Sequence, residues 1–496
     1  MGRGDRRHSR DGRGGRVGWL VAVVLVLALA GGAAVAWRTG TLDDLVDRYL
    51  TAEQPDPVTE PAAVPPPEGV EAPGLPEPEP VAAAASGGTM RPAAVRRALA
   101  RGLADPDLGR SVHVAVADLE RRNAPAYTED TATRSTFTPA STMKLATSLA
   151  ALEALGPDHR FETTVVARGR ALTLVGGGDP TLERTPDEAS AGVPDLATLA
   201  RRTAEALAQG GKAQGGRKKV KPVRLSYDAT LFTGPSASSH WRADYVPDDI
   251  VSPITALWVD EGLSPDHTYR FDDPAAAAAD VFAAALREAG VPVAGPVTAR
   301  RAPRAAEEVA AVESPPLSQV VEHVLEVSDN EGAEVLAHHV GAAVEGEASF
   351  TGGAAGVRRT LDDLGVPLRG VRIHDGSGLA RDNLLAAETL LGVLRAAGDP
   401  DRPELRAVLT GLPVAGFTGS LALRFDTGPE AAVGRVRAKT GSLTGVRSLA
   451  GVAVDQRGTP LAFVLAADRI KYLKTEDAEQ ALDEVAAEIA ACRCSR

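Results

Sequence analysis

The sequence predicts an α+β fold in which an antiparallel sheet is flanked by helices. Val112, Val114 and Val116 alternate with smaller or polar residues, which is the pattern of a half-buried strand. Two apolar runs near the other end, 449–454 and 461–466, flank a Gln-Arg-Gly turn and predict a pair of strands. If the first and last strands share one sheet, helices packed on it complete a layered domain.

Three helices accompany these strands in the sequence. The first is expected from about Pro139 to Gly156, where leucines recur at helical spacing between a proline and a terminating glycine. A closing helix is expected at about 475–491, after the last strand. The alanine-rich segment 275–285 is helical by composition and carries no functional signal.

Three short motifs occur once each along the chain and identify the candidate chemistry. They are Ser141-Thr142-Met143-Lys144, Ser328-Asp329-Asn330 and Lys439-Thr440-Gly441. In this order they are typical of enzymes that acylate an active-site serine with penicillin or with D-alanyl-D-alanine peptides.

The first motif places a nucleophile beside a base. A serine hydroxyl becomes a good nucleophile when a neighbouring group removes its proton. Ser141 and Lys144 are three residues apart and lie on one face of a helix, so the amine can reach the hydroxyl. Burial can lower the pKa of the lysine enough for it to act as a base. In the first turn of the helix, Ser141 would also lie near free N–H groups that favour an oxyanion.

The second and third motifs suit proton transfer and substrate binding. Ser328 can pass a proton to a leaving amine, and the side chain of Asn330 can hold a substrate amide. The third motif reads as a strand, on which Lys439 and Thr440 suit a ligand carboxylate. Gly441 lets a peptide backbone approach the strand closely.

With these motifs the chain resembles the class C low-molecular-mass penicillin-binding proteins, the D-alanyl-D-alanine carboxypeptidase/endopeptidase family. Further segments that match are 174–182, 226–235, 374–383 and 412–416. The resemblance covers roughly residues 95–490. It implies a serine β-lactamase/transpeptidase-like fold, with a catalytic domain at 89–160 and 311–491 and an inserted domain at 161–310.

The resemblance also implies roles for individual residues. Ser141 would be acylated, Lys144 would be its base and Ser328 the proton shuttle. Substrate binding would fall to Asn330, Lys439, Thr440, Gly441 and Ser442. The backbone N–H groups of Ser141 and Ser442 would form the oxyanion hole. Position 442 is serine where the family more often has threonine, which keeps the hydroxyl.

The implied function is that of a serine D-Ala-D-Ala carboxypeptidase that acts on peptidoglycan stem peptides. Endopeptidase activity is also possible. β-Lactam antibiotics would be inhibitors that trap the serine. One alternative is a serine β-lactamase, which often needs a glutamate-activated water for rapid deacylation; the sequence does not place such a glutamate. The other is a non-catalytic wall-binding scaffold, and the intact Ser141, Lys144, Ser328 and Lys439 argue against it.

Several other polar residues have plainer interpretations. His374 and Asp375 could suggest a Ser-His-Asp triad with Ser141, but the lysine makes that arrangement unnecessary. His338 and His339 are expected to face solvent or the core. Asp179 follows three glycines and is expected to form a turn.

The N-terminal segments indicate an extracytoplasmic, cell-envelope protein. Six arginines lie in residues 1–16, the expected cytoplasmic segment, and precede an uncharged apolar run at 17–37. This run is long enough to anchor the protein in a membrane, although Ala-Val-Ala at 34–36 also fits a cleaved signal. Residues 38–88 are expected to form a stalk, because ten prolines and seven acidic residues at 53–88 cannot support a packed core.

Composition narrows the remaining functional classes. The net charge of −12 argues against nucleic-acid binding. No zinc-type Cys/His cluster, phosphate loop or dinucleotide fingerprint stands out, so no cofactor and no metal are expected.

Cys492 and Cys494 could be free thiols, an unusual disulfide or an intermolecular link, or belong to a frayed tail. The basic, glycine-rich stretch 210–219 is expected to be a surface loop, with contact to anionic wall polymer as the alternative.

Overall fold

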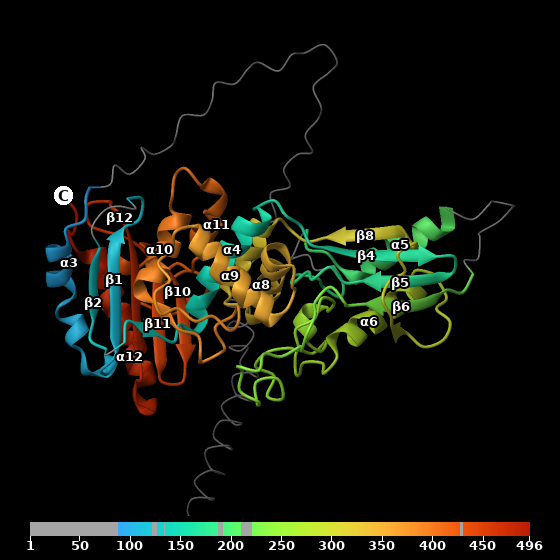
Figure 1. Cartoon of the computed structure of the whole chain (residues 1–496), viewed down its shortest axis with the longest axis horizontal. Coiled ribbons are helices and arrows are strands. Elements are labelled where there is room, and N and C mark those ends of the chain that lie inside the picture. The colour runs from blue at the N-terminus through green and yellow to red at the C-terminus, as the bar shows by residue number, and fades with distance from the viewer. Residues whose placement is uncertain (1–87, 122–125, 133, 187–191, 210–220, 427–429) are drawn as a thin grey trace, which may run out of the picture. The chain divides into compact units, whose positions relative to one another are not determined.

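The computed structural model describes residues 88–121, 126–132, 134–186, 192–209, 221–426 and 430–496 (Figure 1). The cytoplasmic segment, the apolar run 17–37, nearly all of the stalk and the basic stretch 210–219 lie outside these residues. Within the described ranges, no helix is both long and apolar enough to cross a membrane.

A five-stranded antiparallel sheet confirms the expected fold class. Its strands, in spatial order, are β10 (Val436–Leu443), β11 (Val446–Val454), β12 (Pro460–Asp468), β1 (Val112–Asp118) and β2 (Tyr127–Asp130). The first strand, β1, pairs directly with the last, β12. Both strands predicted near the C-terminus are present, and the third motif lies on the edge strand β10.

Both faces of this sheet are buried, so the expected half-buried pattern of β1 is wrong. Val114 and Val116 pack on one face toward helices α3 (Pro92–Leu99) and α12 (Thr475–Ala491). Ala115 and Ala117 pack on the other face toward α4 (Met143–Leu155) and α10 (Ala387–Ala397) (Figure 1). The small residues of the alternation therefore mark a face that helices cover closely, not a solvated one.

The remaining helices of the first core lie beside α4. They are α7 (Leu317–Glu326), α8 (Asn330–Glu345), α9 (Phe350–Asp363) and α11 (Ala407–Thr410). A two-stranded pair of β3 (Thr136–Phe137) and β9 (Leu385–Ala386) adjoins them. The helix expected after Pro139 is present and ends at Gly156, but Ser141 lies in a 3₁₀ turn, Ala140–Thr142, before the α-helix begins. Ala140 has a φ of 49°, a left-handed backbone that interrupts the helix there.

A second five-stranded sheet is formed by residues between 162 and 313. Its order is β7 (Thr298–Ala299), β6 (Arg224–Asp228), β5 (Ala171–Val175), β4 (Glu162–Arg168) and β8 (Glu307–Glu313). β6 pairs in parallel with both β5 and β7, and the other pairs are antiparallel. Helices α5 (Leu196–Gln209) and α6 (Pro274–Glu288) contribute leucine, alanine and phenylalanine side chains to its own hydrophobic core. Helix α6 contains the predicted helix at 275–285.

The C-terminal tail is fixed to the start of the folded region. The backbone of Arg496 pairs with that of Thr89 in both directions, at 3.2 and 3.1 Å. Cys492 and Cys494 form a disulfide, and Cys494 is buried. The interpretation as a frayed tail is therefore wrong. Of the alternatives for the two cysteines, the structure shows the unusual disulfide, formed within the chain.

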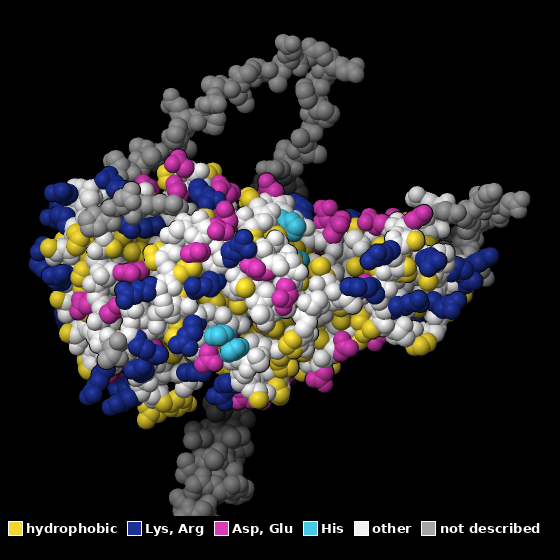
Figure 2. Space-filling model, viewed as in Figure 1, with side chains coloured by type: hydrophobic (Ala, Val, Ile, Leu, Met, Phe, Trp, Pro, Cys, Tyr) yellow, Lys and Arg dark blue, Asp and Glu magenta, His cyan; other side chains and the backbone are white. Residues whose placement is uncertain are grey.

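Charged side chains are unevenly distributed over the described surface. Figure 2 shows Lys and Arg side chains gathered over α3 and over the strands of the second sheet. The chain nevertheless has a net charge of −12. Asp and Glu side chains lie among them on the same face, so the charge of this surface is mixed.

Substitution of a core leucine tests the packing between α4 and the sheet. Leu149→Ala removes a fully buried side chain and should lower the free energy of unfolding by about 3 kcal/mol, because it loses apolar contact and leaves a cavity. Leu423 is 94% exposed, so Leu423→Ala should change the free energy of unfolding by less than about 0.5 kcal/mol. Urea denaturation followed by circular dichroism measures both, and equal losses would contradict this account of the core.

Candidate active site

The three motifs meet in space at the junction of four elements. Lys144, on the first turn of α4, has its Nζ 3.0 Å from Oγ of Ser141 and 2.8 Å from Oδ1 of Asn330. Lys439, on β10, has its Nζ 2.8 Å from Oγ of Ser328. The structure thus brings together five of the eight residues that the sequence predicted for nucleophile, base, shuttle and substrate contacts.

Lys144 is completely buried and suited to the neutral form. Burial lowers its pKa from 10.5 to about 8, although nearby carboxylates act in the opposite direction. A neutral amine has two N–H bonds and one lone pair. The carbonyl oxygen of Ser377, at 2.9 Å, and Oδ1 of Asn330 can accept both N–H bonds. The lone pair then faces the hydroxyl of Ser141, which is the arrangement a general base requires.

The half-buried Ser328 and the buried Lys439 form a second pair. Burial, together with the positive charges of Lys144 and Arg424, holds the pKa of Lys439 well below its ordinary value. Ser328 has a φ of 65°, in the left-handed region that non-glycine residues rarely adopt. Strain of this kind persists where surrounding contacts hold a residue in place. Here it keeps the hydroxyl against the amine of Lys439.

The Lys-Thr-Gly strand passes very close to the turn that carries Ser141. A Cβ at Gly441 would lie 2.6 Å from the carbonyl oxygen of Pro139, so only glycine allows this approach. Thr440 contacts Oγ of Ser420 at 2.9 Å, a neighbour that the motifs did not indicate. Ser442 follows on the same strand and is exposed.

A buried glutamate and a glycine turn complete the site, and the sequence reasoning missed their roles. Glu334 accepts hydrogen bonds from the backbone N–H groups of Gly376 and Ser377, at 3.0 and 2.8 Å. This contact fixes the turn whose carbonyl, that of Ser377, accepts from the amine of Lys144. Glu334 lies four residues after Asn330 and therefore on the same face of α8, which is a signal that could have suggested it.

The structure gives no support to a Ser-His-Asp triad. The ring of His374 stacks on that of His240, with centroids 3.9 Å apart. Asp375 accepts hydrogen bonds from Nε1 of Trp241 at 2.9 Å and from Nδ2 of Asn383 at 2.6 Å. Both residues therefore have other partners, as expected when a lysine serves as the base.

The adjacent histidines and Asp179 have structural roles. Nδ1 of His338 contacts the carbonyl of Glu334 at 2.8 Å, and Nε2 of His339 contacts that of Gly178 at 2.9 Å. Burial lowers the pKa of both histidines to about 4, so both are neutral core residues. Asp179 accepts two hydrogen bonds from the residue two positions later, which is the predicted turn.

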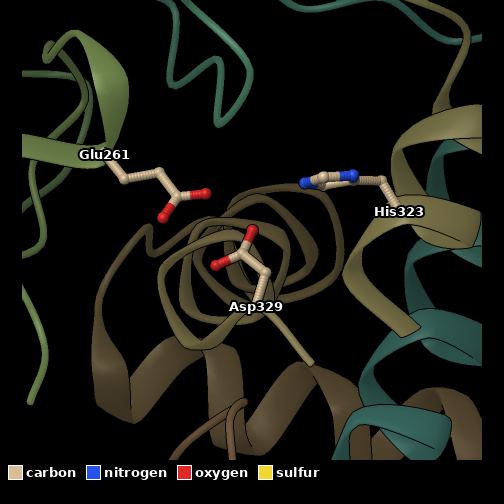
Figure 3. A group of neighbouring side chains, drawn as sticks. All are labelled: Glu261, His323 and Asp329. Carbon is tan, nitrogen blue, oxygen red and sulfur yellow. The ribbon is translucent and has the colours of Figure 1, made fainter. Parts of the chain in front are cut away.

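One group of side chains in the described ranges could hold a metal ion. Glu261, His323 and Asp329 bring one ligand atom each within 4.8 Å of one another (Figure 3). Asp329 is the middle residue of the second motif. The sequence predicted no metal because no zinc-type ligands cluster along the chain. These three residues come from separate segments and lie near one another only in the fold.

Comparison with known proteins extends over most of the chain. A profile of the D-Ala-D-Ala carboxypeptidase 3 (S13) family matches residues 95–271 and 264–489. A carboxypeptidase of Mycobacterium tuberculosis is 34% identical over 451 residues, which cover 86% of this chain and 91% of that protein. The carboxypeptidase DacB of Mycolicibacterium smegmatis is 32% identical over 480 residues, 95% of this chain and 96% of that protein.

The fold agrees with the sequence comparison. The crystal structure of penicillin binding protein 4 from Haemophilus influenzae matches with a TM-score of 0.63, at 21% identity over 79% of this chain and 98% of that one. An antiparallel sheet flanked by helices, interrupted by a second unit between the first two motifs, is therefore an established arrangement. The family match, the two relatives and the assembled motifs lead to one conclusion: the chain belongs to the D-Ala-D-Ala carboxypeptidase 3 (S13) family of serine carboxypeptidases.

Proposed function

We propose that Ser141 is the residue that this D-Ala-D-Ala carboxypeptidase acylates, with Lys144 as its general base. One observation carries the proposal: the buried amine lies 3.0 Å from the hydroxyl oxygen, and two carbonyl oxygens at 2.8 and 2.9 Å can accept its N–H bonds. A lone pair directed at the hydroxyl is what turns serine into a nucleophile.

The reaction proceeds through an acyl-serine ester. Oγ of Ser141 bonds to the carbonyl carbon of the penultimate D-Ala, and the bond to the nitrogen of the terminal D-Ala breaks. The proton that Lys144 takes from the serine is passed through Ser328 to the leaving nitrogen, with Lys439 beside that hydroxyl. The N–H groups of Ser141 and Ser442 stabilise the oxyanion. Water then hydrolyses the ester and restores the hydroxyl.

Substrate binding uses groups that border the nucleophile. Oδ1 of Asn330 contacts the catalytic lysine, and among the described residues its Nδ2 has no hydrogen-bond partner, so this amide can donate to a substrate carbonyl. Lys439 and Thr440 bind the terminal carboxylate of the peptide. Gly441 and Ser442 lie on the edge strand of the sheet, where an extended peptide can add as a further strand.

The substrates we propose are peptidoglycan stem peptides ending in D-Ala-D-Ala. Cleavage of cross-links as an endopeptidase would use the same steps with a different leaving amine. β-Lactams would acylate Ser141 and remain attached. A β-lactamase would need a carboxylate free to activate water. Glu334 does not offer one, because both its oxygens accept backbone N–H groups.

The family acts on the cell wall, so the protein works outside the cytoplasm. We propose that residues 17–37 attach it to the membrane and that 38–88 act as the stalk. We also propose a catalytic domain at 89–160 and 311–491 and an inserted domain at 161–310. The second sheet, whose strands all fall between 162 and 313, supports this division.

Mass spectrometry of the intact protein with benzylpenicillin tests the nucleophile. The full chain should gain one adduct that persists for hours, and Ser141→Ala should gain none. Release of D-Ala from a D-Ala-D-Ala peptide should fall by about 10⁴-fold or more in this variant, because no other group replaces the nucleophile.

Ser135→Ala is the matched control, since this serine is exposed and lies six residues earlier. It should keep both the adduct and the activity. An adduct that survives in Ser141→Ala would refute the assignment of the nucleophile, and rapid antibiotic turnover without an adduct would favour the β-lactamase.

The pH dependence of acylation tests the base. Burial lowers the pKa of Lys144 to about 8, and only the neutral amine accepts a proton. The second-order rate of acylation by benzylpenicillin should therefore rise with pH and level off above about 8. Stopped-flow kinetics across pH 6 to 10 (roughly two pH units on either side of the pKa) measures this. Circular dichroism at each pH controls for unfolding, and a rate that is flat or falls over this range would exclude Lys144 as the base.

A further inference from the structure

We propose that Glu261, His323 and Asp329 form a binding site for a divalent transition-metal ion such as Zn²⁺, next to the active site. The three side chains come from the inserted segment, from α7 and from the second motif. Figure 3 shows both carboxylates and the imidazole pointing toward a common space. Two carboxylate oxygens and one imidazole nitrogen are a ligand set that zinc accepts, with further positions left for water.

The ligand atoms lie near one another but are further apart than they would be around a bound ion. They lie within 4.8 Å of one another, whereas two ligands of one tetrahedral zinc ion, each about 2.1 Å from it, are about 3.4 Å apart. Small rotations of the Glu261 and His323 side chains close this difference. Both side chains have room for it, because they border a cavity of about 810 Å³.

These ligand groups are not occupied by other contacts. Within the described ranges, neither the carboxylate of Glu261 nor the imidazole of His323 has a hydrogen-bond or ion-pair partner. Asp329 is only 8% exposed, and its single side-chain bond runs from the N–H of Gly332 to Oδ1, at 2.8 Å. No hydrogen bond to its second oxygen is present among the described residues, and Asp329 borders the same cavity.

Two guanidinium groups near the site have their closest partners elsewhere. Arg184, which lines the cavity, pairs with Asp260 at 3.2 Å. Arg270 pairs with Oε1 of Glu331 at 2.8 Å and donates to Oγ of Ser252 and to the backbone oxygen of Glu261. In the part of the chain that the structure describes, no ion pair joins it to the carboxylate of Glu261 or Asp329. The positive charge of Arg270 acts on both carboxylates without a direct ion pair, and a bound cation would add a direct contact to each of them.

The position of the site gives a bound ion a specific consequence. Asp329 separates Ser328 from Asn330, and these two contact the amines of Lys439 and Lys144. An ion held by Asp329 together with Glu261 would join the second motif to the inserted segment. It would act as a positioning site and take no part in the bonds that form and break.

Calorimetric titration of Zn²⁺ into the chelator-treated full chain at pH about 7.5, above the ordinary pKa of histidine, tests the proposal. The protein should bind one equivalent, and its thermal midpoint should rise with Zn²⁺ concentration. His323→Gln and Glu261→Gln should each weaken binding by at least about 10-fold, since even outer partners of metal ligands contribute that much. Both variants spare the motif residues.

His267→Gln is the matched control, because this histidine lines the same cavity outside the ligand group. It should bind Zn²⁺ like the unaltered protein. Metal-free thermal midpoints of all three variants should agree, which separates lost binding from lost folding. Failure of the unaltered chain to bind Zn²⁺ would overturn the proposal, as would binding that both ligand variants retain or that His267→Gln loses equally. These outcomes do not depend on peptidase activity and leave the proposed function untouched.

Discussion

Burial of the Lys144 amine is the constraint on which the rest of the active site depends. A lysine in water is protonated at neutral pH and cannot take a proton from serine. Here the surrounding residues of α4, from 143 to 152, are all buried, and desolvation brings the pKa to about 8. The two carbonyl oxygens that accept its N–H bonds come from α8 and from the turn at Ser377. Three chain segments must therefore meet before Lys144 can activate Ser141, the nucleophile that we propose.

The sheet provides the rigidity that holds these chain segments in position around Lys144. Its alanine-rich face lets α4 and α10 pack closely, and its bulkier face is covered by α12. The edge strand β10 then runs past the turn of Ser141 at a distance that only Gly441 permits. Close packing of this kind transmits displacements, so a change in the packing of the core would shift the position of Ser141.

Much of this arrangement could be predicted from the sequence because it is encoded locally. The motifs, the strand pair near the C-terminus and the closing helix each depend on residues that are near in sequence. The left-handed backbone of Ala140 and Ser328 was not predictable, since contacts from distant segments impose it. Nor was the contact of Glu334 with Gly376, or the burial of both faces of β1, because each depends on which segments pack together.

A buried glutamate that directly follows the second motif joins the inserted segment to Asn330. Glu331 directly follows Asn330, is 2% exposed, and accepts a hydrogen bond from the N–H of Ser252 and an ion pair from Arg270. Burial of a carboxylate is costly unless such partners are present. The helix that presents Asn330 to Lys144 therefore depends on contacts from the inserted segment. That segment supports the position of a catalytic contact and is more than an appendage to the carboxypeptidase fold.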